Sequence, residues 1–178
     1  ATDPAKGFLG GVTAFLIDAT AAGYGRGQSF EKMGLRTCPI GETVLDDVRV
    51  GPDAVLGRVG SGGPIFARSM EWERVCIAAT HCGHMERLIE TCLEYAKTRK
   101  SAGKSIGSFQ AVSHRIADMR VRLEAARLVT YRAAWQLERK SSIGLEASVA
   151  KIFVSEALVE TAREAMQIFG GSGYMVDY

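Results

Sequence analysis

The sequence lacks any apolar run close to the roughly 20 residues that a membrane-spanning helix needs, and it predicts no signal peptide. It also lacks a strong charge: 22 Lys and Arg stand against 20 Asp and Glu, a formal net charge of +2. That balance argues against a protein that coats nucleic acid or another polyanion. Internal repeats and low-complexity tracts are absent too. With 178 residues, 47% of them apolar, the chain can bury the core of about one domain.

Cysteine is scarce and shows no Cys-x-x-Cys spacing, so we expect free thiols rather than disulfides or a zinc site. The four positions are Cys38, Cys76, Cys82 and Cys92. Free thiols are typical of a reducing compartment, the cytoplasm or, in a eukaryote, the mitochondrial matrix. His81 and His84 lie one helical turn apart, but no further ligand completes a set, so no metal site is predicted.

The chain divides near residue 57 into a β part and a helical part. The apolar run at 12–17 and the alternation of Val44, Val48 and Val50 with charged residues predict two strands in the first part. We therefore predict domains at 1–57 and 58–178. The chain opens on Ala-Thr-Asp-Pro without Met and stops just after a glycine cluster, so we expect either processed ends or a piece of a longer protein.

From residue 63 onward the apolar period changes to that of helices. We predict long helices over about 63–100, 110–139 and 145–169. Small and apolar residues recur every three or four positions, which predicts an antiparallel bundle with close packing. The predicted buried stripes are Ile77, Met85, Ile89, Cys92 and Ala96; then Phe109, Val112, Ile116, Met119, Leu123, Ala126, Thr130, Ala133 and Leu137; then Ala147, Ala150, Val154, Ala157, Thr161 and Ile168.

A basic segment from Lys97 to Lys140 holds eleven Lys and Arg against three acidic residues. The simplest interpretation is a solvated helix face. The alternative is a site for a phosphorylated cofactor, favoured by the basic, glycine-containing loop 99–107 just before a helix N-terminus. Nucleic acid is a weaker option, because no aromatic residues are interleaved for base stacking.

Two further segments are candidates for chemistry. Glu71 and Glu73 fall near the start of the first long helix, where Glu71 would gain from the helix dipole. Glu73 has apolar neighbours that suit a general base, although a simple ion pair with a bundle arginine is the plainer alternative. The glycine-rich stretch 167–174 either ends a helix or lets backbone approach a ligand.

Taken in order, these motifs resemble the acyl-CoA dehydrogenase family of flavoproteins. The matching segments are Phe30-Glu31-Lys32-Met33-Gly34-Leu35-Arg36, Leu45 to Val50 with Val55-Leu56-Gly57, Arg99 to Gly103 with Ile106-Gly107 and Phe109-Gln110, and Gln167 to Tyr174. The resemblance implies an α+β fragment. It would comprise the end of a middle β-barrel or β-sandwich domain and an antiparallel long-helix bundle that lacks its last helices.

The resemblance also implies an FAD-dependent oxidoreductase that removes the α and β hydrogens of an acyl thioester. Trp72-Glu73-Arg74 looks most like isovaleryl-CoA dehydrogenase-like members and relatives acting on carrier-protein thioesters, so Glu73 is the implied α-proton base. The other implied site residues are Glu71 and Arg74 for substrate, and Arg99, Gln110, Gln167, Ile168, Phe169, Gly170 and Gly171 for FAD. Implied partners are an acyl-CoA or a carrier-bound acyl or aminoacyl group, an electron-transfer flavoprotein, and further copies of the chain in a dimer or tetramer.

Several alternatives stay open. Most family members keep the base in a segment that would lie beyond Tyr178, and Ala102 stands where the family has an aromatic residue near the adenosine. A flavin monooxygenase or oxidase on the same fold, or a non-catalytic subunit that supplies half of a flavin site, also fits the motifs.

Overall fold

The computed structural model describes residues 2–139 and 142–177, so Lys140 of the basic segment lies outside the described residues. The chain forms two compact units, Ala1–Ala67 and Arg68–Tyr178. The predicted domain boundary after residue 57 stays a prediction.

The first unit combines short helices with two small antiparallel sheets. The first sheet pairs β1 (Ala14–Phe15) with β4 (Val55–Leu56), and the second pairs β2 (Tyr24–Phe30) with β3 (Ile40–Leu45). Its helices are α1 (Gly7–Gly11) and 3-10 turns at Pro4–Lys6 and Pro52–Ala54.

The strand predicted from Val44, Val48 and Val50 is wrong in its second half. β3 ends at Leu45, and Asp47 has a φ of 48°, in the left-handed region that an extended strand does not enter. The run at 12–17 forms a strand only at β1. Both errors have the same origin, because apolar alternation does not reveal where a backbone turns.

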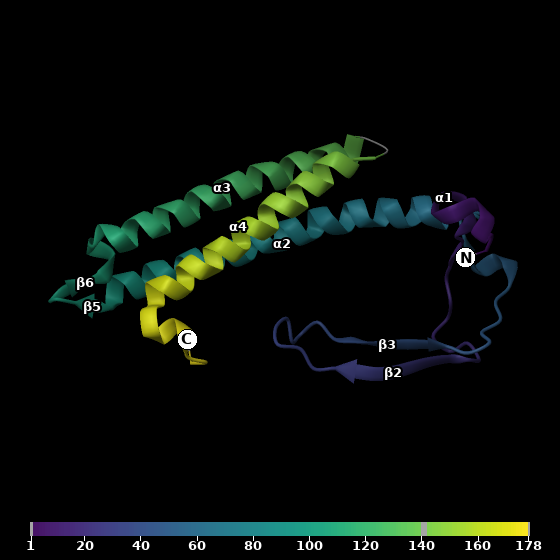
Figure 1. The fold of residues 1–178 in the computed structure, drawn as a ribbon, viewed down its shortest axis with the longest axis horizontal. Helices are drawn as coiled ribbons and strands as arrows, with labels where there is room; N and C mark the ends of the chain where they lie inside the picture. The colour runs from purple at the N-terminus through teal and green to yellow at the C-terminus, as the bar shows by residue number, and fades with distance from the viewer. Residues whose placement is uncertain (1, 140–141, 178) are drawn as a thin grey trace. The chain divides into compact units, whose positions relative to one another are not determined.

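The second unit is a bundle of three long helices, as predicted (Figure 1). They are α2 (Gly62–Thr98), which begins within the first unit, α3 (Gln110–Arg139) and α4 (Gly144–Phe169). A small hairpin, β5 (Lys100–Ser101) with β6 (Lys104–Ser105), and a 3-10 turn at Ile106–Ser108 join α2 to α3; another 3-10 turn, Gly170–Tyr174, follows α4. No described helix is both long and apolar enough to cross a membrane.

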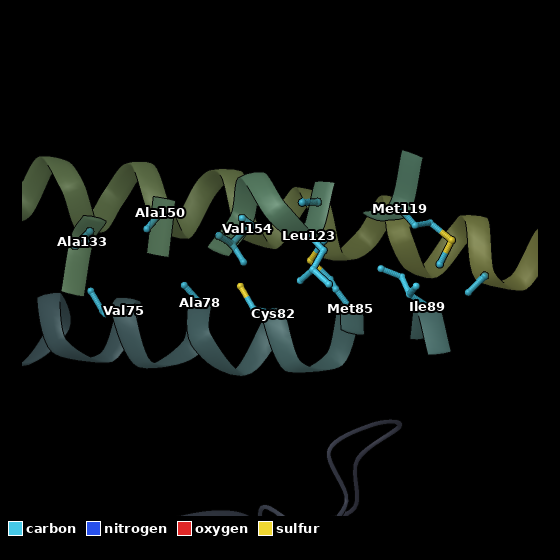
Figure 2. Close-up of a cluster of buried hydrophobic side chains, with 14 of the residues drawn as sticks. Val75, Ala78, Cys82, Met85, Ile89, Met119, Leu123, Ala133, Ala150 and Val154 are labelled. Atoms are coloured by element: carbon cyan, nitrogen blue, oxygen red, sulfur yellow. The ribbon is translucent and has the colours of Figure 1, made fainter. Parts of the chain in front are cut away.

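The core of the bundle lies where the three helices face one another (Figure 2). The stripes on α3 and α4 are buried from Met119 to Leu137 and from Ala147 to Ile168, with alanine at many contacts, so the helix backbones can approach closely. On α2, Ile77 is 42% exposed, and the stripe instead passes through Val75 and Ala78. Ile77 was misassigned because adjacent apolar residues leave the orientation of a helix face ambiguous.

All four cysteines are free thiols, as predicted. Cys38 and Cys76 are exposed, whereas Cys82 and Cys92 are buried in the bundle. Burial raises the pKa of Cys92 to about 11, which leaves it a protonated, unreactive core residue at neutral pH.

Candidate functional site

A small pocket between α2 and α4 brings Glu73 and Arg74 together. Its cavity is about 210 Å³, and we call it the α2–α4 pocket. It is lined by Met70, Glu73, Arg74, Ile77, Ala78 and His81 from α2 and by Lys151 and Ser155 from α4. The α2 residues recur every three or four positions, so they share one side of the helix.

Contacts between α2 and α4 hold the two walls of this pocket in register. The Arg74 guanidinium donates a hydrogen bond to Ser148 Oγ at 3.3 Å. At the other end of the bundle, Tyr95 donates to the Phe169 carbonyl oxygen at 3.5 Å. Both pairs join residues 74 positions apart, so α2 and α4 run in the same direction with a constant offset.

Glu73 has no hydrogen bond or ion pair among the described residues, so the bundle-arginine alternative finds no support. Its side chain lines a pocket whose walls include the apolar Met70, Ile77 and Ala78. A carboxylate without a fixed partner remains available to accept a proton from a bound molecule. The geometry is that of a candidate general base.

Glu71 lies on another side of α2 and does not line this pocket. Its side chain is only 8% exposed. One carboxylate oxygen accepts a hydrogen bond from Arg68 at 2.8 Å and the other from Ser142 at 2.6 Å. Burial acts to raise the pKa of Glu71, but the hydrogen bonds from Ser142, Arg68 and the Ile143 backbone N–H, with the charge of Arg68, hold that pKa below its usual value.

These contacts make Glu71 a link between helices. Arg68 also donates to the Leu137 carbonyl oxygen at 3.2 Å, so the pair joins α2 to the end of α3 and the start of α4. The explanation by the helix dipole is wrong, because α2 begins at Gly62 and the dipole acts only within the first turn. The substrate contact that the family resemblance implies for Glu71 stays a prediction.

A second cavity, of about 510 Å³, lies at the other end of the bundle. We call it the glycine-turn pocket. It combines the end of α2 and its hairpin with the turn after α4. Its lining residues are Tyr95, Arg99, Lys100, Ser101, Ile106, Ile168, Phe169, Gly170, Gly171, Ser172 and Met175. Five of the seven residues that the resemblance implies for FAD, namely Arg99, Ile168, Phe169, Gly170 and Gly171, therefore meet here.

Two stacked aromatic side chains line the glycine-turn pocket. The rings of Tyr95 and Phe169 stack with centroids 4.1 Å apart and planes 13° apart. This contact holds the end of α4 against the end of α2. Tyr95 was not identified from the sequence, because nothing local links it to a residue 74 positions away.

The hairpin beside Arg99 turns through two left-handed residues, Ala102 (φ 49°) and Gly103 (φ 79°). Two positive φ angles are what a tight two-residue hairpin turn requires, and alanine adopts this conformation at a cost of about 1–2 kcal/mol. Ala102 is exposed at the tip, and does not line the glycine-turn pocket.

The other two residues implied for FAD lie outside this pocket. Gln110 is the first residue of α3 and is exposed. Gln167 lines an adjacent cavity of about 400 Å³ with Arg163 and Tyr174. The structure thus places Gln167 beside the glycine turn but on a different side of it.

The lining of the glycine-turn pocket suits an anionic, partly aromatic ligand. Arg99 and Lys100 supply positive charge, and none of the described acidic side chains lines the cavity. A side chain added at Gly170 or Gly171 would meet nothing within 4 Å, so ligand atoms can approach the backbone there. The residues present therefore fit the phosphates and flat rings of a dinucleotide.

Three arginines of the basic segment form ion pairs on α3. On α3, Arg115 pairs with Glu164, Arg120 with Glu124 at 2.8 Å, and Arg127 with both Glu86 and Glu124. These pairs support the interpretation of a solvated helix face for α3. Arg99 and Lys100, at the start of the segment, line the glycine-turn pocket together with the turn after α4. Lys97 and Arg120 line a different cavity, of about 620 Å³.

His81, Lys151 and Ser155 were not identified as members of the candidate site. His81 follows Glu73 and Ile77 at four-residue spacing, so its place on the same side of α2 could have been predicted from the sequence. Lys151 and Ser155 line the pocket only because α4 packs against α2. Among the described residues, no group of three or more His, Cys, Asp or Glu could hold a metal ion.

Comparison with known proteins agrees with the geometry. The family model described as acyl-CoA dehydrogenase, C-terminal domain, matches residues 60–178. The chain is 41% identical over 177 residues to an L-prolyl-[peptidyl-carrier protein] dehydrogenase of Pseudomonas fluorescens, and 43% identical over 171 residues to one of Serratia. These alignments cover 99% and 96% of this chain but 46% and 44% of those proteins.

Solved structures give the same result. A structure of PigA with FAD and proline superposes with a TM-score of 0.92 at 41% identity, over 99% of this chain and 46% of that one. Butyryl-CoA dehydrogenase from Megasphaera elsdenii superposes with a TM-score of 0.94 at 35% identity, over the same shares. The chain thus spans about half the length of the relatives it matches. With its bundle fold and its family match, the chain belongs to the acyl-CoA dehydrogenase family.

Proposed function

We propose that the complete protein catalyses the FAD-dependent α,β-dehydrogenation of an acyl thioester, with Glu73 as the base. The observation that carries this proposal is the exposed Glu73 carboxylate, which has no hydrogen bond or ion pair among the described residues and lines the α2–α4 pocket beside Arg74. Relatives named as dehydrogenases of carrier-bound prolyl groups and of acyl-CoA support it.

In this reaction Glu73 removes the proton on the α-carbon of the thioester, and the electrons of that C–H bond form the new double bond. FAD, when bound, accepts the β-hydrogen together with its electron pair. Arg74, tied to Ser148, lines the same pocket and adds positive charge near the developing enolate oxygen. Arg99, Lys100 and the glycine turn lie at the far end of α2 from Glu73, so they would hold the phosphates of an FAD that serves the Glu73 of a neighbouring copy of the chain.

The substrate is proposed to be carried by a carrier protein or by coenzyme A. Relatives named as prolyl-carrier dehydrogenases support the first, and the short-chain acyl-CoA dehydrogenase of Megasphaera elsdenii supports the second at 35% identity. An electron-transfer flavoprotein is the proposed electron acceptor, since a relative is a subunit of the caffeyl-CoA reductase-Etf complex. We further propose a cytoplasmic or mitochondrial-matrix homodimer or homotetramer, with the FAD site shared between copies.

The direct test is anaerobic mixing of the complete flavoprotein with prolyl-carrier and butyryl-CoA thioesters. We expect flavin absorbance near its visible maximum to bleach with one of them, with an α,β-unsaturated product. A flavin that stays oxidised with both would contradict the proposal. Oxygen consumption by the reduced enzyme would instead favour an oxidase, the activity named for the related AnaB protein.

The proposed cofactor site predicts a loss of FAD affinity on Arg99→Ala. Removing one charge-assisted contact with a phosphate should weaken binding by about 10- to 100-fold. Equilibrium titration of the apoprotein with FAD measures the change. Arg132→Ala, at an exposed arginine of α3 that does not line this pocket, is the matched control and should leave FAD affinity unchanged. Equal FAD affinities for the two variants would show that Arg99 is not part of the site.

A further inference from the structure

Ser148, on α4, accepts the hydrogen bond that fixes the Arg74 side chain. The Arg74 guanidinium donates to Ser148 Oγ at 3.3 Å, and it has no other hydrogen bond or ion pair with the described residues. Arg74 lines the α2–α4 pocket, whereas Ser148 does not. The remaining N–H donors of the guanidinium are therefore available to a group bound in the pocket.

The direction of this bond is set by a second contact of the Ser148 hydroxyl. Its proton goes to the Gly144 carbonyl oxygen, one turn earlier on α4, at 2.7 Å. A hydroxyl has a single proton and arginine has only donors, so Ser148 Oγ is the acceptor for Arg74. The start of α4 is in turn held to α2, because Glu71 accepts a hydrogen bond from Ser142 at 2.6 Å. Hydrogen bonds thus connect Glu71, the first turn of α4 and Arg74.

Arg74 needs a restraint because charges of both signs line the same pocket. Glu73 and Lys151 are the other charged residues of this lining. A guanidinium free to move would be drawn toward the Glu73 carboxylate and repelled by the Lys151 ammonium. Arg74 and Glu73 form no ion pair with each other in the structure. That separation leaves the Glu73 carboxylate able to accept a proton.

We propose that Ser148 is a positioning residue for α-deprotonation. It holds the Arg74 guanidinium in the α2–α4 pocket and keeps it from pairing with Glu73. This rests on the proposed function, in which Glu73 takes the α-proton and Arg74 supplies positive charge. Ser148 acts only through Arg74, because it does not line the pocket itself.

Ser148→Ala in the complete flavoprotein tests this role by stopped-flow measurement of flavin reduction. With the thioester that reduces the wild-type flavin, we expect the rate constant at saturation to fall about tenfold, which corresponds to one hydrogen bond to a charged group. The Kd of the thioester should change by less than about twofold. Ser148→Thr should restore most of the rate. Threonine can make the same contact, since Thr80 and Thr91 donate to the carbonyl four residues earlier, as Ser148 does.

A double-mutant cycle separates positioning from a general effect on the fold. In an Arg74→Met background, Ser148→Ala should cause no further loss of rate, because the residue that it positions is absent. Thr91→Ala is the matched control: it removes a similarly bonded hydroxyl that does not line the α2–α4 pocket, and it should leave the rate unchanged. Additive losses in the cycle, or equal rates for Ser148→Ala and Thr91→Ala, would overturn the proposal.

A crystal structure of Ser148→Ala gives a result that does not depend on turnover. We expect the Arg74 guanidinium to leave its position beside residue 148, and to keep that position in Ser148→Thr. An unmoved guanidinium in Ser148→Ala would overturn the proposal even if flavin reduction were slower. If the wild-type flavin is not reduced, a displaced guanidinium would retain the link between Ser148 and Arg74 and reject the reaction.

Discussion

Replacing Glu73 with Gln is expected to lower the rate of α-proton exchange by about 10²- to 10⁴-fold, the usual contribution of a general base. The amide keeps the shape of the side chain but cannot accept the proton. Because Glu73 lies in the α2–α4 pocket and not in the glycine-turn pocket, FAD content should be unchanged. Exchange of the thioester α-proton with deuterated solvent, followed by NMR, measures the rate.

Glu90→Gln is the matched control for this variant. Glu90 is an exposed residue of α2 paired with Arg87, and its substitution should leave exchange at the wild-type rate. Wild-type exchange in Glu73→Gln would assign the base to another residue.

Replacing Glu71 with Ala is expected to destabilise the bundle by about 2–4 kcal/mol. The variant loses the ion pair with Arg68 and the hydrogen bonds from Ser142 and the Ile143 N–H. The lower end of the range reflects Arg68, which is about one-third exposed and can recover hydration. Urea unfolding of the chain, followed by circular dichroism, measures the loss.

The contribution of Glu71 should depend on pH in a defined direction. Its pKa is lowered in the folded chain, so its stabilisation is complete above the unfolded-state pKa and is lost as pH falls through the lower folded-state value. The stability difference between wild type and Glu71→Gln should therefore shrink in acid. Glu90→Ala, at an exposed pair, should cost less than about 1 kcal/mol. Equal losses for Glu71→Ala and Glu90→Ala would contradict the structural role of Glu71.

The three long helices were predictable because burial imposes a period on the sequence. The stripe from Met119 to Leu137 repeats every three or four residues and is buried throughout. Ile77 shows the limit of this signal, since an apolar residue beside a buried alanine can face either the core or a pocket. In the β part, Asp47 turns the chain where alternation predicted a strand, because a left-handed residue leaves no trace in an apolar pattern.

The distinct surroundings of Glu71 and Glu73 depended on packing. Both are acidic residues in one short segment, and local sequence offers them similar roles. Only the positions of Ser142 and Ile143 at the start of α4 show that Glu71 is buried and bonded while Glu73 lines a pocket. Side chains two positions apart on an α-helix are rotated by about 200° around the helix axis, so Glu71 and Glu73 meet different neighbours.

The amino-acid sequence by itself determined the helical class, the free thiols and the family, since periodicity, composition and ordered motifs are local properties that survive without coordinates. Only the tertiary structure decided which residues share a pocket. It brought Arg99 to Gly170, and the α2 residues Glu73 and His81 to Lys151 and Ser155 of α4. The reason is physical: a site is formed by side chains from separate helices, and the offset between helices is fixed by core packing.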